Sequence, residues 1–122
     1  MTIIIQFIHK YWHIITLTQL IIITALSLWP IDALPPVPGS DKTHHFIAYA
    51  FLALPVVIRQ HSHWLYFCFA FIAWSGVIEL IQPYVNRYGE WLDMLANSTG
   101  VFIGIIFALL LLKIHKKTTH NK

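Results

Sequence analysis

Four apolar stretches divide the chain, and polar or proline-containing segments separate them. The stretches cover residues 11–29, 43–58, 64–82 and 91–112. A helix needs roughly 20 mostly apolar residues to cross a hydrocarbon core of about 30 Å, and these stretches approach or reach that length. The pattern predicts an all-α protein, an integral membrane four-helix bundle in which residues 1–122 form a single domain.

The segments between the stretches predict where each helix ends. Residues 30–40 contain four prolines and a glycine, which favour an extended chain. Residues 59–63 form a short loop, so the second and third helices should be antiparallel neighbours. Pro83 should end the third helix, and we expect the basic tail, residues 113–122, to fray.

Composition supports a membrane protein and argues against a nucleic-acid partner. The chain is 57% hydrophobic and 11% charged, whereas an average soluble domain has roughly 25% charged residues. Its net charge is +3, but the basic residues are scattered at segment ends and form no basic stripe. We expect no nucleic acid, no cofactor and no bound metal.

The distribution of lysine and arginine predicts the orientation. The two terminal segments and the 59–63 loop contain six of these residues, and the other two connections contain only Lys42 and Arg87. Because basic residues concentrate on the cytoplasmic side, both termini should be cytoplasmic. The connections that carry most of the polar residues should then face the extracytoplasmic side of the cytoplasmic membrane.

Polar side chains gather at the predicted outer ends of three helices. Glu79 and Gln82 are three residues apart and Asp93 and Asn97 are four apart, so each pair shares a helix face. A carboxylate in such an apolar setting is costly unless it is paired or functional. We therefore predict an outward-facing polar pocket, and its candidate residues are Asp41, Lys42, His45, Tyr49, Glu79, Gln82, Arg87, Asp93 and Asn97.

Three chemical interpretations of this pocket remain open. In the first, His45 and Glu79 handle a proton beside an ionised Asp93, and this trio is catalytic. In the second, the same trio binds a divalent metal, which we disfavour because no HExxH-like motif is present. In the third, the polar groups bond to one another and hold the helices together.

If the pocket acts on a ligand, the remaining polar residues are candidates for binding it. Lys42 and Arg87 would hold an anionic headgroup, and Asn97 would help to orient it. The full set of candidate binding residues is Asp41, Lys42, Tyr49, Gln82, Arg87 and Asn97.

A glycine pair in the last apolar stretch indicates close helix packing. Gly100 and Gly104 form a GxxxG pattern, and such small residues let two helix backbones approach each other. Packing within one chain is the favoured interpretation, and a homodimer through this pair is the alternative.

The order and spacing of these motifs resemble the VanZ-like membrane protein family. The resemblance covers residues 29–112 and rests on DKxxHFxxY from Asp41 to Tyr49, ExxQ from Glu79 to Gln82, Arg87, and DxxANxxGxxxG from Asp93 to Gly104. It implies a small bacterial membrane protein that acts at the outer surface of the cytoplasmic membrane. The namesake of the family is associated with resistance to the glycopeptide antibiotic teicoplanin.

From the motifs and the resemblance together, we expect a protein that binds or modifies a lipid-linked component of the cell envelope. Its partners would be membrane lipids or lipid-linked envelope precursors. The alternative is a structural or accessory membrane protein without enzymatic activity, and the sequence leaves open whether catalysis occurs. A transporter is disfavoured, because the predicted cytoplasmic halves of the second and fourth helices are almost entirely apolar.

Overall fold

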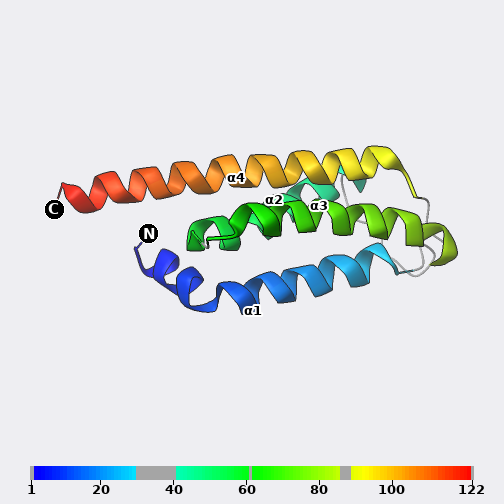
Figure 1. Ribbon diagram of the computed structural model, residues 1–122, viewed down its shortest axis with the longest axis horizontal. Helices are drawn as coiled ribbons and strands as arrows, with labels where there is room; N and C mark the ends of the chain where they lie inside the picture. The colour runs from blue at the N-terminus through cyan, green and yellow to red at the C-terminus, as the bar shows by residue number, and fades with distance from the viewer. Residues whose placement is uncertain (1, 30–40, 61, 86–88, 122) are drawn as a thin grey trace.

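The computed structural model describes residues 2–29, 41–60, 62–85 and 89–121. Throughout this part of the chain the regular structure is helical, and it contains no strand. Four long helices run side by side, and both ends of the chain lie at the same end of the bundle (Figure 1). The elements are α1 (Thr2–Ser27), α2 (Asp41–Arg59), α3 (Trp64–Ile81), the short 3-10 turn η2 (Gln82–Val85) and α4 (Trp91–His120).

The terminal helices are longer than the apolar pattern predicts. α1 begins at Thr2, well before residue 11, and α4 continues to His120. The prediction that the basic tail frays is therefore wrong for residues 113–120. Lysine is a good helix former, and the hydroxyls of Thr118 and Thr119 donate hydrogen bonds to carbonyls four residues earlier in the same helix.

The two prolines within the helical segments have different effects. Pro83 follows the end of α3, as predicted, and the chain tightens there into η2 because proline has no N–H to continue the helix. Pro55 is buried inside α2, which nevertheless continues to Arg59. The predicted extended segment, residues 30–40, lies outside the described residues.

Two glycines of α4 set its distance from α2. A Cβ atom built on Gly100 would lie 2.3 Å from the carbonyl oxygen of Phe46, and one built on Gly104 would lie 2.3 Å from that of Ala50. Only glycine allows the two backbones to come this close, and Cα–H groups that face carbonyl oxygens are typical of such interfaces. The GxxxG pair therefore packs within one chain, as favoured, and a homodimer stays a prediction.

Hydrogen bonds and ring contacts attach α1 to the other helices. The indole Nε1–H of Trp74 in α3 donates to the hydroxyl of Thr24 over 2.9 Å, and the Gln19 amide donates to the Phe51 carbonyl of α2 over 3.3 Å. Near the middle of α1, the Trp12 ring meets the Phe67 ring of α3 edge to face. α1 is thus part of the bundle and lies against both α2 and α3.

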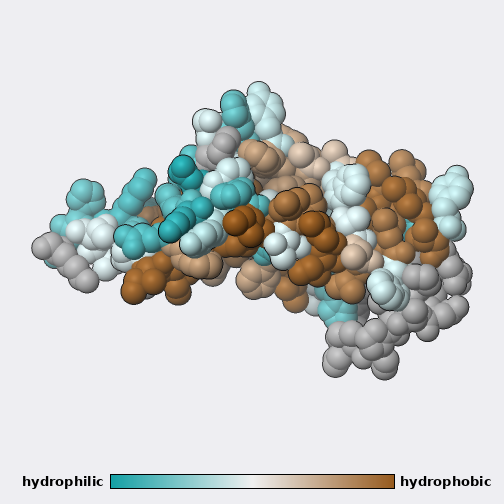
Figure 2. Space-filling model, turned by 90° about the horizontal axis from the view of Figure 1, so that it is seen from below, coloured by the Kyte–Doolittle hydropathy of each residue, from teal (hydrophilic) through white to brown (hydrophobic). Residues whose placement is uncertain are grey.

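The outside of the bundle is strongly apolar, as expected for a lipid-facing surface. Large apolar side chains of α1 and α4 are exposed along the helices, among them Ile21, Leu26, Phe102 and Leu110. Figure 2 shows such residues over much of one face of the molecule. Within the described residues, two segments are long and apolar enough to cross a membrane, Trp64–Val85 and Trp91–His120. That all four helices span the membrane stays a prediction.

Candidate functional site

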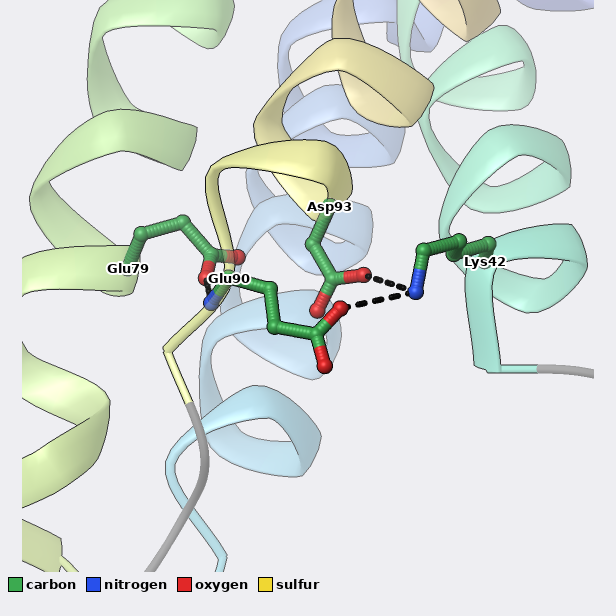
Figure 3. Close-up of polar contacts among 4 residues, drawn as sticks. All are labelled: Lys42, Glu79, Glu90 and Asp93. Carbon is green, nitrogen blue, oxygen red and sulfur yellow. Dashed lines mark hydrogen bonds and ion pairs between the residues drawn. The ribbon is translucent and has the colours of Figure 1, made fainter.

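The polar residues that the sequence placed together meet where α3 ends and where α2 and α4 begin. Lys42 comes from the first turn of α2, Glu79 from the last turn of α3, and Glu90 and Asp93 from the start of α4 (Figure 3). Lys42 points toward the carboxylates of Glu90 and Asp93, and Glu79 points toward the backbone nitrogen of Glu90. We call these four residues the polar cluster.

Glu79 stabilises the start of α4 from a different helix. Its side chain is buried, and Oε2 accepts a 2.8 Å hydrogen bond from the backbone N–H of Glu90, the N-cap residue of α4. The side chain of Glu90 itself makes no capping bond. Because free N–H groups and the helix dipole both favour negative charge at a helix N-terminus, Glu79 does here what the third-position glutamate of a capping box does within a single helix.

Gly89 allows this contact by keeping the space beside α3 free. A Cβ atom at position 89 would lie 2.5 Å from the backbone carbonyl oxygen of Glu79 and 3.3 Å from Cδ of Pro83. The chain that leads into α4 therefore passes directly against the end of α3. Any larger residue at position 89 would push the Glu90 N–H away from the Glu79 carboxylate.

Lys42 connects α2 to the start of α4. Its Nζ lies 2.8 Å from Oε2 of Glu90 and 3.6 Å from Oδ1 of Asp93. The Lys42 and Glu90 side chains are about half exposed, whereas that of Asp93 is 5% exposed. The hydrogen bond to the Glu90 carboxylate, helped by the charge of Asp93, raises the pKa of Lys42 above its ordinary value.

Several buried acceptors at this end of the bundle have no hydrogen-bond donor within 3.5 Å in the described part of the chain. They include Oδ1 of Asp93 and Oδ1 of Asn97, one helical turn apart on α4, and Oε1 of Gln82. The Lys42 ammonium is 3.6 Å from the Asp93 oxygen, an ion-pair distance that is longer than a hydrogen bond. Asp93 is 3% exposed and Asn97 is 2% exposed. Since buried polar atoms normally have partners, these oxygens could accept hydrogen bonds from a ligand.

Gln82 and Tyr49 are buried near the same end of the bundle. The Gln82 amide donates a 3.1 Å hydrogen bond to the carbonyl of Ser27, and this bond attaches the end of α3 to the end of α1. Tyr49 lies on α2, almost fully buried. Arg87 and the side chain of Asp41, both predicted site residues, lie outside what the structure describes.

The proposed proton-handling trio is not joined by bonds among the described residues. His45 is partly buried on α2, but no hydrogen bond or ion pair links it there to Glu79 or Asp93. In the same part of the chain, no group of three or more histidine, cysteine or acidic residues could hold a metal ion.

Comparison with known protein families agrees with this arrangement. The family model described as VanZ/LLP1 matches residues 2–112, nearly the whole chain. The protein belongs to the VanZ/LLP1 family. Comparisons with curated proteins and with solved structures give no match. Family membership together with the two long apolar helices indicates a membrane protein.

In this VanZ/LLP1 protein, sequence reasoning identified three residues of the cluster and missed Glu90. Glu90 was not among the predicted site residues, although it directly precedes the predicted start of the fourth helix, where an N-cap residue is expected. Gly89 and Ser27 were missed as well. Both contribute through backbone atoms, for which the sequence gives no distinct signal.

Proposed function

We propose that this VanZ/LLP1 protein binds the polar headgroup of a lipid-linked envelope component at the outer face of the cytoplasmic membrane. The observation that carries the proposal is the group of buried acceptor oxygens on Gln82, Asp93 and Asn97, which have no hydrogen-bond donor within 3.5 Å in the described part of the chain. Asp93 lies beside the half-exposed Lys42, and Asn97 is one helical turn further along α4.

The chemistry of these groups indicates which part of a lipid they would contact. Carboxylate and amide oxygens accept hydrogen bonds, so Asp93 and Asn97 suit hydroxyl or ammonium groups of a headgroup. Lys42 is exposed enough to exchange Glu90 for a phosphate of the same lipid. Oε2 of Glu79 accepts a hydrogen bond from the Glu90 N–H, so this carboxylate stabilises the start of α4. For that reason we favour ligand binding over proton transfer by Glu79 at this site.

Replacement of Asn97 by leucine provides a test. Asn97→Leu keeps the branched shape of the side chain and removes its amide group, including the Oδ1 acceptor that bonds to nothing described. The matched control is Ser75→Ala, which removes a buried hydroxyl that bonds within α3, to the carbonyl of Ile72. Lipids that co-purify with each variant would be identified by mass spectrometry at equal membrane levels.

We expect one lipid class to be lost from Asn97→Leu and retained by Ser75→Ala. Identical lipid profiles for the wild type and both variants would refute the binding proposal. If the lipid is a precursor of the cell wall, cells that express the wild type should also differ in teicoplanin susceptibility from cells that express Asn97→Leu.

A structural role is the second candidate, and a specific set of contacts favours it. Gln82 attaches α3 to α1, Glu79 attaches α3 to α4, and Lys42 attaches α2 to α4. Interhelical hydrogen bonds of this kind hold membrane bundles together. If this is the only role, disrupting the contacts will lower the amount and stability of the protein and leave its bound lipids unchanged.

The proposed orientation needs its own experiment. Tyr84, in η2, is 88% exposed and lies at the cluster end of the bundle. In a Cys68→Ser background, a single cysteine at position 84 should react with a membrane-impermeant reagent in intact cells. A cysteine at position 117, near the C-terminal end of α4, should react only after permeabilisation. The opposite pattern would reverse the orientation.

A further inference from the structure

A basic cavity lies at the end of the bundle opposite the polar cluster. Its volume is about 560 Å³, and it is bounded by the start of α1, the end of α2 and the C-terminal part of α4. Hydrophilic residues gather at this end of the molecule (Figure 2). The side chains that can carry positive charge in its wall are His9, Lys10, Arg59, His115 and Lys116.

Among the described residues that line this cavity, none is acidic. The chain contains five acidic residues, at positions 32, 41, 79, 90 and 93. Asp41 begins α2, and Glu79, Glu90 and Asp93 belong to the polar cluster at the far end, while position 32 lies outside the described residues. Within the described part of the chain, the positive charges of Lys10, Arg59 and Lys116 in the wall therefore have no acidic side chain beside them, and a bound anion would balance them.

The form of the cavity suits an anion that carries an apolar portion. Ile5 and Leu112 supply apolar wall beside the basic side chains, and the volume falls within the roughly 300–1,000 Å³ of ligand sites. Gln60 directly follows α2 with a positive φ of 55°, and its side-chain amide donates a 2.7 Å hydrogen bond to the Val57 carbonyl. This cap places Arg59 and Gln60 in the wall of the cavity.

We propose that this cavity binds a phosphate-bearing anion, with Arg59 and Lys116 as its main contacts. Arg59 can offer two parallel N–H donors to a phosphate, whereas Lys116 contributes a point charge. Lys10 lies over the Tyr11 ring, 5.3 Å from its centroid, and adds charge at the rim. Basic pockets between membrane helices on the cytoplasmic side bind the headgroups of anionic lipids, so either a lipid or a free phosphate could supply the ligand.

The test measures how ligands stabilise the full-length chain in a neutral detergent. The probes are phosphatidylglycerol, phosphatidylcholine and inorganic phosphate, and apparent affinity follows from the rise of the unfolding temperature with probe concentration. The cavity variant is Arg59→Gln combined with Lys116→Gln. The matched control, Lys113→Gln with Lys117→Gln, removes the same charge from exposed residues outside the cavity wall.

We expect phosphatidylglycerol, inorganic phosphate or both to stabilise the wild type, and phosphatidylcholine to have no effect. At about 1 kcal/mol for each basic contact, the cavity variant should lose roughly 30-fold in affinity. The control variant should lose less than about threefold in affinity for the same probe. Stabilisation by phosphatidylglycerol alone would identify a lipid headgroup, whereas an equal effect of inorganic phosphate would identify a free phosphate-bearing anion.

Two results would overturn the proposal. If the cavity variant and the control lose the same affinity, the attraction is diffuse and the cavity is not a binding site. If neither phosphatidylglycerol nor inorganic phosphate stabilises the wild type, the cavity does not bind a phosphate-bearing anion. If the double variant does not fold, Lys116→Gln alone still tests the idea, because this side chain is exposed and its loss should weaken binding about fivefold.

Discussion

Replacement of Gly104 by alanine tests whether the glycine pair sets the distance between α2 and α4. The added methyl group would lie 2.3 Å from the carbonyl oxygen of Ala50 and 3.0 Å from its carbonyl carbon, whereas ordinary contacts begin near 3.4 Å. The helices must therefore separate locally by about 1 Å, because a backbone carbonyl cannot rotate aside. Overpacking of this kind costs about 1–3 kcal/mol.

Gly76 in α3 provides the matched control. Its added methyl group would meet Cε and Sδ of Met94 at 3.1 and 3.3 Å, and that flexible side chain can move. Glycine to alanine within a helix gains about 1 kcal/mol of propensity at either site, so this gain cancels when the two variants are compared. Gly104→Ala should therefore be less stable than Gly76→Ala by about 1–3 kcal/mol.

Denaturant unfolding of the purified protein in detergent, followed by helical circular dichroism, measures this difference. The slope with denaturant should be the same for both variants, so that the change in midpoint reports stability alone. Equal midpoints would refute the close approach of α2 and α4. A lower midpoint for Gly76→Ala than for Gly104→Ala would place the tight interface on α3.

Three further predictions concern the polar contacts. Glu79→Ala should destabilise the protein by about 0.5–2 kcal/mol. Glu79→Gln should destabilise it less, because the amide oxygen can still accept the hydrogen bond from the Glu90 N–H, and denaturant unfolding of both variants checks this order. Gln82→Met should cost about 0.6 kcal/mol and increase hydrogen exchange near Ser27, because it removes the bond to that carbonyl. The pKa of Lys42 is raised from 10.5, so the stabilisation that its ion pair provides should be complete below pH 10.5 and lost as the pH rises above the raised pKa. The difference in stability between the wild type and Lys42→Gln, measured across pH, checks this.

Periodicity and proline placement predicted the four helices and the meeting of three cluster residues. Glu79, Lys42 and Asp93 come together because each stands at a helix end, and helix ends follow directly from the apolar pattern. The pairing of Lys42 with Glu90 could not be predicted in the same way. The Lys42–Glu90 pair depends on the backbone distance between α2 and α4. The spacing of the glycines indicates that α4 packs closely against another helix, but it does not identify that helix as α2.

The basic residues illustrate a second limit of sequence reasoning. In the sequence, Lys10, Arg59 and Lys116 served only to predict orientation, because they are far apart along the chain. The cavity that they line arises from the packing of three helix ends. The extension of α4 to His120 was missed because the basic tail gives no apolar periodicity, although its lysines favour a helix.

The dependence of the cluster on α4 has a consequence for biosynthesis. Chains emerge from the ribosome N-terminus first, so α1, α2 and α3 are synthesised before Glu90 and the two glycines of α4. During that interval Glu79 is present without the Glu90 N–H, and Lys42 without either carboxylate. The cluster therefore forms only after the start of the last helix has been made, and a nascent chain arrested before residue 90 would leave Glu79 and Lys42 without these partners.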